Sequence, residues 1–364
     1  MAGRRKRIWC AVSGHGFGHF SQVAPILNQL AQTLPDPEIH VTGGVPQELI
    51  ARMLVRPFTH DPHNRDVGLL QTDPLVVDRQ ATAEAVRRLH RDWPEKVAAE
   101  ARLMAAWSPD LVLADIPYLS LAAARAVGVP SVAIASLTWD EVLAAYLPDH
   151  PELGQWLALM RDAYAAATLA LLVTPALPVH PFPRSEIIPA ITTPGVPHRA
   201  RMRQVHDIAD DRPVILVSLG GIPARTLPVD GLIRDTRFHW LLDVPCPAGY
   251  DHVHPLRILP ELPFHDLAAS VDGIVSKPGY GMAIAATASQ VPFVYVRRGV
   301  FPDEPPICAW IERHGRAMEL DGDAWRRGEF GVALQRLMRL PVKPVPDVRG
   351  AMVAAGLCLD RFLS

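Results

Sequence analysis

The chain has 364 residues, enough for two ordinary domains with full cores. Its 36 Lys and Arg residues nearly balance 38 Asp and Glu residues, so the chain lacks the large net positive charge that would favour binding to nucleic acid. The four cysteines are scattered without a CxxC pair, and the longest nearly apolar run, Tyr164 to Val173, is too short to span a bilayer. We therefore expect a soluble cytoplasmic protein without a disulfide frame, whose membrane contact is at most peripheral, through Arg4 to Arg7.

The first informative stretch is a glycine turn with two histidines, residues 12–20. An apolar run from Arg7 to Val12 precedes it, and a segment with helical spacing follows, which predicts strand, turn and helix at the start of an α/β domain. Alternate glycines let the backbone approach a ligand, and imidazole takes a proton near neutral pH. The candidate residues of this loop are Gly14, His15, Gly16, Gly18 and His19.

Other glycine-loop motifs fit this turn poorly. A dinucleotide fingerprint needs a third glycine where His19 stands and an acid after the second strand, which instead ends in Thr42-Gly43-Gly44. A phosphate-binding loop of the ATPase kind needs Gly-Lys-Ser/Thr, and none follows. A purely structural turn, in which the histidines cap the helix, is an alternative at this point.

The next segments predict a helix near residues 46–54, a polar loop and a long helical region over residues 81–106. The loop, His60 to Asp66, pairs two histidines with two aspartates, but its Pro and Asn favour an exposed loop over a metal site. Pro94 predicts that the helical region is kinked or split.

Asp115 ends a buried strand over residues 108–115. A helix over 118–127 and a strand over 131–136 follow, so Asp115 and the histidine loop both stand at carboxyl ends of strands, where ligands gather in parallel sheets. Helix capping is the alternative role for Asp115. Trp139 and Tyr146 open a segment that could line an acceptor, and the strand over 169–173 is expected to be the last of this domain.

A second strand–turn–helix pattern covers residues 272–288. Its turn contains Lys277, Gly279, Tyr280 and Gly281, where a helix N-terminus can receive phosphate. An earlier strand ends in the turn Gly220-Gly221. We predict domains over residues 1–200 and 201–347, with a helix in 348–364 that packs back on the first domain.

The loop Gly14 to His19 resembles the N-terminal loop of GT-B glycosyltransferases. It is similar to the loop of the peptidoglycan and galactolipid glycosyltransferases and, most of all, of the transferase-like N-terminal domain of L-arabinokinases. The resemblance implies a GT-B fold: α/β, with two Rossmann-like parallel-sheet domains that face a central cleft. It also implies that His19, or as second candidate His15, faces the acceptor, with Asp115 orienting the histidine.

The second stretch carries the same resemblance through Lys277, Gly279-Tyr280-Gly281, Pro292, Arg297-Arg298 and Asp303-Glu304. It implies donor binding by the two glycine turns, Lys277 and Arg297, and contacts from Asp303 and Glu304 to sugar hydroxyls. A solvated charged loop is the alternative for Arg297, Arg298, Asp303 and Glu304. One position departs from the family pattern, because Ala285 stands where a glutamate holds the donor ribose.

The resemblance implies an inverting, metal-independent transferase that needs no cofactor besides a nucleotide sugar as co-substrate. The acceptor would be a small molecule or a lipid head group. Ala285 supports an alternative, a non-catalytic GT-B module that binds a sugar nucleotide or a protein partner. A GT-B epimerase or hydrolase acting on sugar nucleotides is a further alternative.

Overall fold

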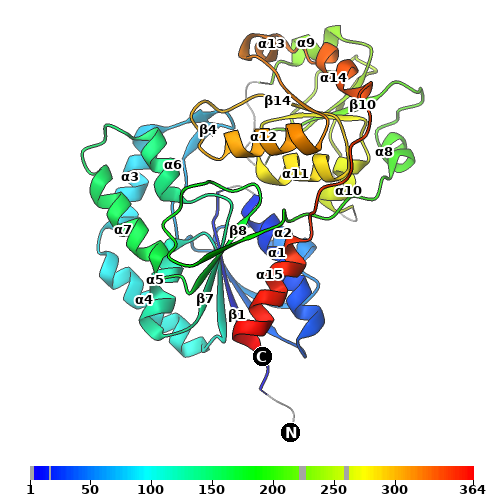
Figure 1. The fold of residues 1–364 in the computed structure, drawn as a ribbon. Coiled ribbons are helices and arrows are strands. Elements are labelled where there is room, and N and C mark those ends of the chain that lie inside the picture. Colours follow the sequence, from blue (N-terminus) through cyan, green and yellow to red (C-terminus); the bar gives the residue numbers. More distant parts are fainter. Residues whose placement is uncertain (1–3, 16–17, 221–226, 258–261) are drawn as a thin grey trace.

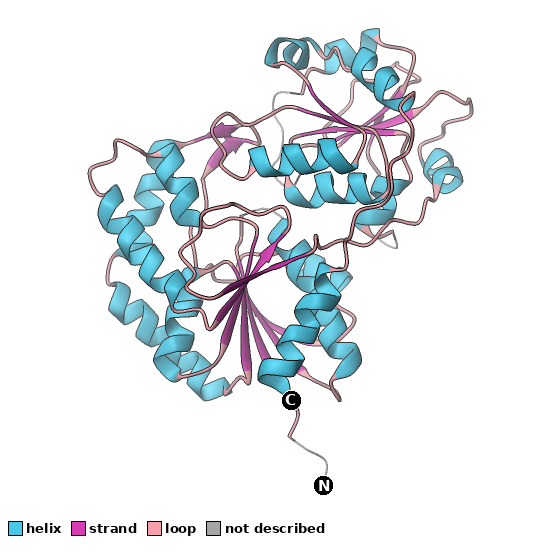
Figure 2. Cartoon of the chain, viewed as in Figure 1, coloured by secondary structure: helices cyan, strands magenta, loops and turns pink. Residues whose placement is uncertain are grey.

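The computed structural model describes residues 4–15, 18–220, 227–257 and 262–364. These residues form two α/β domains, each built on a parallel sheet with helices on both faces (Figure 1). The sheets and the helices that cover them stand out in Figure 2. The expected architecture of two Rossmann-like domains is confirmed.

The first sheet has seven strands in the order β3-β2-β1-β6-β7-β8-β9, all paired in parallel. Alternate residues of a strand point to opposite faces, so Ile8 and Cys10 enter one core cluster and Trp9 and Ala11 another. The strands are β1 Arg7–Val12, β2 Glu38–Thr42, β3 Phe58–Asp61, β6 Leu111–Asp115, β7 Ser131–Ala135, β8 Leu169–Val173 and β9 Ser185–Ile188.

The edge strand β9 corrects our prediction that the strand over 169–173 is the last of the domain. The prolines around it indicate a connecting loop. Proline is nevertheless tolerated in an edge strand, because the backbone groups on its outer side form no hydrogen bonds within the sheet. The helices of this domain are α1 Gly18–Thr33, α2 Gln47–Met53, α3 Arg79–His90, α4 Trp93–Trp107, α5 Tyr118–Val127, α6 Trp139–Tyr146 and α7 Leu153–Ala165. The break between α3 and α4 falls at Arg91 and Asp92, as Pro94 predicts.

A two-stranded antiparallel hairpin, β4 Gln71–Asp73 and β5 Val76–Val77, leaves the first domain towards the second. Its tip residue Leu75 packs against a core cluster of the second domain. In return, Phe301 of the second domain is 3% exposed within a core cluster of the first. Each domain therefore inserts an apolar side chain into a core cluster of the other.

The second sheet has six parallel strands in the order β12-β11-β10-β13-β14-β15. Its strands are β10 Val214–Val217, β11 His239–Leu242, β12 Val253–Pro255, β13 Gly273–Ser276, β14 Phe293–Tyr295 and β15 Ala317–Glu319. The helices are α8 Arg199–Val205, α9 Val229–Arg234, α10 Phe264–Ala269, α11 Tyr280–Ala288, α12 Glu304–His314, α13 Gly322–Arg327 and α14 Gly331–Met338.

The chain returns to the first domain at its end. Helix α15, Gly350–Cys358, continues into a π-helical turn over Leu359–Leu363 and packs along α1 (Figure 1). One apolar cluster contains residues of α1, α15 and α11, so the core on this side runs through both domains. Among the residues that the structure describes, every helix is too short or too polar to cross a membrane.

Candidate functional site

A buried histidine–carboxylate pair lies at the carboxyl end of the first sheet. Strands β1 and β6 pair in parallel with Val12 opposite Asp115, so the glycine turn after β1 and the end of β6 meet at one edge. His19, in the first turn of α1, places Nδ1 2.7 Å from Oδ1 of Asp115. His19 is 6% exposed and Asp115 1% exposed, so little water screens the pair.

This pair determines the protonation chemistry of His19. Burial alone would lower the pKa of the imidazole, but the charge and hydrogen bond of Asp115 outweigh it and raise the pKa above 6.5. With the Nδ1 proton donated to the carboxylate, Nε2 keeps the lone pair. His19 is thus a strengthened base whose tautomer is fixed, a role that a carboxylate commonly gives a catalytic histidine.

His15 lies beside the pair but in a different environment. Its ring is 5.0 Å from Trp139 at a near-perpendicular angle, and the ring of His19 is 5.7 Å from the same tryptophan. Burial, together with the positive charges of His19, Lys277 and Arg298, lowers the pKa of His15 to about 3. The glycine turn therefore holds one basic imidazole and one that stays neutral.

Lys277 of the second domain faces these histidines from between two glycine turns. A Cβ on Gly220 or on Gly279 would lie 3.8 Å from its Cε, and Gly220 has a φ of +86° that favours glycine. Burial and the neighbouring Arg298 lower the pKa of Lys277 to about 7. Gly221 lies outside the described residues.

An arginine and two carboxylates follow β14 and close the site. Arg298 donates from Nε and from its backbone N–H to Glu304, the latter bond measuring 2.9 Å, and its Nη2 lies 3.5 Å from Asp303. All three residues are buried, and the charge of Asp303 contributes to the raised pKa of His19. The reading of Asp303 and Glu304 as a solvated charged loop is therefore wrong.

The fold of the two domains is similar to the folds of solved glycosyltransferases. The UDP-glucosyltransferase from Polygonum tinctorium has a TM-score of 0.63 at 12% identity, and the calicheamicin glycosyltransferase CalG4 one of 0.60 at 18%, with all of each chain covered. The glycosyltransferase VinC in complex with DTDP has a TM-score of 0.53 at 19% identity, covering 96% of this chain and 100% of that one. The chain has the GT-B fold.

The sequence comparisons are sparser. The L-arabinokinase of Arabidopsis thaliana is 25% identical over 354 residues, which cover 94% of this chain. The chain spans 33% of that relative's length. No family model matches the chain.

Within this GT-B fold, three residues that the family resemblance assigns to the donor have protein partners. The hydroxyl of Tyr280 donates to the carbonyl of Thr174 (2.9 Å) and accepts from the N–H of Ile191 (3.1 Å), and so joins the two domains. Arg297 is half exposed and pairs with Glu319, 2.8 Å away. Both oxygens of Glu304 are engaged by Arg298, which leaves Asp303 as the freer carboxylate of its pair.

The glycines of the two turns differ in what they permit. A Cβ on Gly14 would lie 2.3 Å from Oδ1 of Asn64, so a side chain there would have to displace that amide. Gly281 approaches Ser21 of α1, whose Oγ would be 3.3 Å from an added Cβ. Gly18 has open space around it, and Gly16 lies outside the described residues.

The polar segment His60 to Asp66 is more buried than the sequence indicates. Arg65 is 6% exposed because Glu100 of α4 and Asp61 both pair with it, and Asp66 is 4% exposed. The Nε2 of His60 bonds to the carbonyl of Gly43 instead of facing a metal. Among the described residues, no cluster of His, Cys, Asp and Glu could hold a metal ion.

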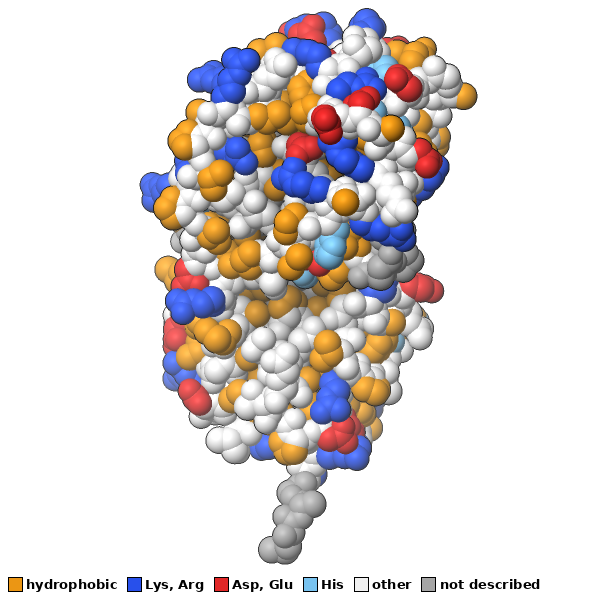
Figure 3. Space-filling view, turned by 90° about the vertical axis from the view of Figure 1, so that its right-hand side faces the viewer, with side chains coloured by type: hydrophobic (Ala, Val, Ile, Leu, Met, Phe, Trp, Pro, Cys, Tyr) orange, Lys and Arg blue, Asp and Glu red, His pale blue; other side chains and the backbone are white. Residues whose placement is uncertain are grey.

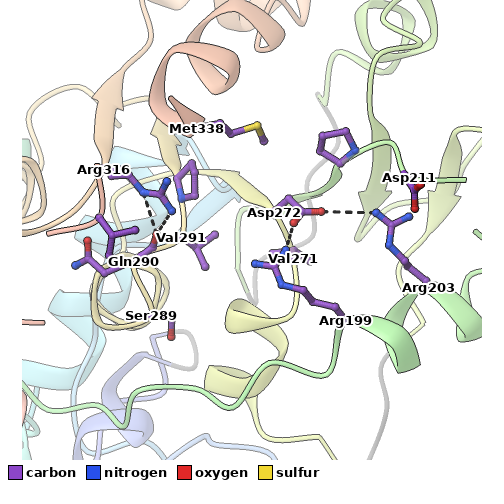
Figure 4. Close-up of a pocket in the computed structure, with 13 residues that line it drawn as sticks. Arg199, Arg203, Asp211, Val271, Asp272, Ser289, Gln290, Val291, Arg316 and Met338 are labelled. Atoms are coloured by element: carbon purple, nitrogen blue, oxygen red, sulfur yellow. Dashed lines mark hydrogen bonds and ion pairs between the residues drawn. The ribbon is translucent and has the colours of Figure 1, made fainter. Parts of the chain in front are cut away.

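A separate hollow of about 510 Å³ lies at the amino ends of β10, β13 and β14 (Figure 4). Its arginines already have partners: Arg199 and Arg203 point to Asp272, and Arg316 donates to the carbonyl of Gln290. Parallel sheets present their ligand sites at the opposite edge, where Lys277 lies. On the face seen in Figure 3, acidic and basic side chains are intermixed, in keeping with the balanced composition.

Proposed function

We propose that the chain is a glycosyltransferase that moves a sugar from a nucleotide-sugar donor to a hydroxyl acceptor. The observation that carries this proposal is the buried pair of His19 and Asp115, 2.7 Å apart, on the first domain of a GT-B fold. A base with a raised pKa and a fixed tautomer suits the removal of a proton from a hydroxyl group. The GT-B fold shared with solved glycosyltransferases supports this reaction class.

The mechanism we propose is a single displacement with inversion. Nε2 of His19 takes the proton of the acceptor hydroxyl while its oxygen forms a bond to the anomeric carbon. The bond from that carbon to the donor diphosphate breaks on the opposite face, and the electron pair leaves with the diphosphate. Asp115 stabilises the imidazolium that results.

The second domain offers groups that would neutralise the leaving diphosphate. Lys277 supplies a positive charge between the turns at Gly220 and Gly279, and the N-terminus of α11 begins beside it at Tyr280. We assign Asp303 to the sugar hydroxyls, since a carboxylate can accept from two neighbouring hydroxyls. These groups supply the electrostatic stabilisation without calling for a metal.

A non-catalytic GT-B module that binds a sugar nucleotide is the second candidate, and Ala285 favours it. Its side chain cannot accept a hydrogen bond from a ribose hydroxyl, and it is 1% exposed inside an apolar cluster. Installing a glutamate there would bury an unpaired carboxylate, which costs several kcal/mol. In the natural chain, with Ala285 at this position, other groups of the second domain would have to hold the ribose.

Assays of the wild type and of the His19→Ala variant together distinguish the two candidates. If the chain is a transferase, this variant loses transfer by about a hundredfold or more and binds the nucleoside diphosphate as the wild type does. If the chain is a binding module, the wild type itself binds the nucleotide but releases no diphosphate from any nucleotide sugar. Equal transfer by both proteins would remove His19 as the base.

A further inference from the structure

The segment from Asp66 to Gln71 passes directly over the histidine turn. A Cβ added to Gly68 would lie 2.8 Å from Cη2 of Trp139 and 2.9 Å from Cβ and Cδ2 of His15. Only a residue without a side chain allows the backbone this close to both rings. The segment is therefore packed against His15 at its middle.

Both ends of the segment are also fixed. The Oδ2 of Asp66 accepts from the indole Nε1 of Trp139 at 2.7 Å, and the side chain of Ser13 is close enough to act on the pKa of its carboxylate. At the other end, Oε1 of Gln71 lies 3.1 Å from Nε2 of His15. Ser13 and His15 both belong to the turn after β1, so the segment holds this turn at two points.

The hydrogen bonds of Gln71 determine which ring nitrogen of His15 carries a proton. Its Nε2 donates to the carbonyl of Pro74 at 2.9 Å and lies 3.4 Å from the carbonyl of Asp73. The flipped amide would set its oxygen against these two carbonyl oxygens, so Oε1 is the atom that faces His15. An amide oxygen only accepts, and Nε2 of His15 must therefore be the N–H.

Burial, and after it the surrounding charges, keeps His15 neutral. The ionised groups that act on its ring are His19 of α1 and Lys277 and Arg298 of the second domain, all of them positive when charged. Trp139 of α6 and Phe301, whose ring centroid is 6.5 Å away, cover it without charge. Protonation would place a further cation among these groups.

We propose that Gln71 is a positioning residue that holds His15 as the neutral Nε2–H tautomer, opposite to the Nδ1–H tautomer that Asp115 imposes on His19. The proton acceptor of His19 is then Nε2, and the only lone pair of His15 is on Nδ1. The two histidines cannot exchange roles: His19 takes the proton and His15 serves as a neutral hydrogen-bonding group. The catalytic consequence rests on the proposed transfer reaction, whereas the tautomers do not.

The direct test is nuclear magnetic resonance of the full chain with ¹⁵N-labelled histidine, with the His15 signals assigned by their loss in His15→Gln. We expect a protonated Nε2 and a bare Nδ1 in His15 at neutral pH, and a mixture of the two tautomers in Gln71→Leu. A bare Nε2 in the wild type, or an unchanged spectrum in a folded Gln71→Leu protein, would overturn the proposal. This readout needs no enzymatic activity, so it stands even if no transfer is found.

The pH profile gives the second test. Gln71→Glu places a carboxylate on Nε2 of His15, which favours the imidazolium, so the rate should fall more steeply with decreasing pH than the wild-type rate does. Gln71→Leu should lower kcat/KM by about tenfold, the effect of one lost neutral hydrogen bond. Gln80→Glu, at a nearby residue of α3 whose amide donates to the exposed Glu84, is the matched control and should leave the profile unchanged. Wild-type profiles in both Gln71 variants would contradict a positioning role.

Discussion

His19 and Asp115 are 96 positions apart in the chain, yet Nδ1 of the imidazole lies 2.7 Å from Oδ1 of the carboxylate. Parallel pairing of β1 with β6 brings them together, since each residue follows or ends a strand at the same edge of the sheet. The second oxygen of Asp115 is buried and has no hydrogen-bond partner among the described residues. The carboxylate is therefore committed to His19.

Asp115→Asn should move the acid limb of the pH–rate profile to lower pH. Asp115 raises the pKa of His19 above 6.5, and the base works only when deprotonated, so removing the charge lets the imidazole stay neutral in more acidic solution. The plateau rate should nevertheless fall about a hundredfold or more, because the imidazolium loses its counter-charge. Asp162→Asn, at an exposed ion pair, is the control. An acid limb that stays in place would contradict the assigned pairing.

Affinity for a nucleoside diphosphate should weaken as the pH rises above about 7. Burial and Arg298 lower the pKa of Lys277 to about 7. The ammonium group attracts the diphosphate only when it is protonated. Above about pH 7 a growing fraction of the protein has a neutral Lys277, so the affinity falls. Titration calorimetry from pH 6 to 9 measures this. Lys277→Met should bind about 10- to 100-fold more weakly at pH 6 and lose most of the pH dependence. A Lys277→Met protein with wild-type affinity would exclude Lys277 from the donor site.

Phe301→Ala should loosen the junction between the domains. The Phe301 ring is 3% exposed, and the guanidinium carbon of Arg298 lies 3.6 Å from its centroid. Truncation leaves a cavity, and the free energy of unfolding should fall by about 3 kcal/mol in a denaturant titration. Val300→Ala is the neighbouring control, since that side chain is 53% exposed and its change should stay within about 0.5 kcal/mol. Equal effects of both variants would show that Phe301 does not anchor the junction.

The folded state should lose stability as the pH falls below about 6.5. Burial lowers the pKa of His15 to about 3 and that of His90 to about 4, so the unfolded chain binds more protons than the folded chain between these values and 6.5. The raised pKa of His19 acts in the opposite direction. His90→Gln should reduce the slope of unfolding free energy against pH. An unchanged slope would show that His90 does not couple to folding.

The fold and the proximity of His19 to Asp115 were predictable from the sequence because the signals for the strands are local. Apolar runs followed by glycine turns mark strands that end at one edge of a parallel sheet, and His19 and Asp115 stand at two such ends. Burial of Asp66 was not predictable, because it depends on contacts with Trp139 and Ser13 that no spacing reveals. A polar residue in a run of polar residues reads as exposed unless its partners are known.

The same limit applies to the second domain. The sequence shows charged residues after β14, but only the folded loop directs both oxygens of Glu304 to Arg298 and brings Asp303 within reach of the charge of Lys277. Likewise, nothing in the turn 277–281 indicates that the hydroxyl of Tyr280 bonds across the domain junction to Thr174. The contact of Tyr280 joins segments distant in sequence, and hydrophobic periodicity reports only local secondary structure. The sequence pattern therefore does not predict it.

The most direct test of the account measures nucleoside diphosphate release from a panel of nucleotide sugars, in the presence of a pool of hydroxylic acceptors. The wild type and His19→Ala are compared, with diphosphate binding measured in both. We predict acceptor-dependent release from at least one donor by the wild type, and a loss of about a hundredfold or more in His19→Ala with binding retained. No release from any donor, or release by His19→Ala at the wild-type rate, would contradict the account.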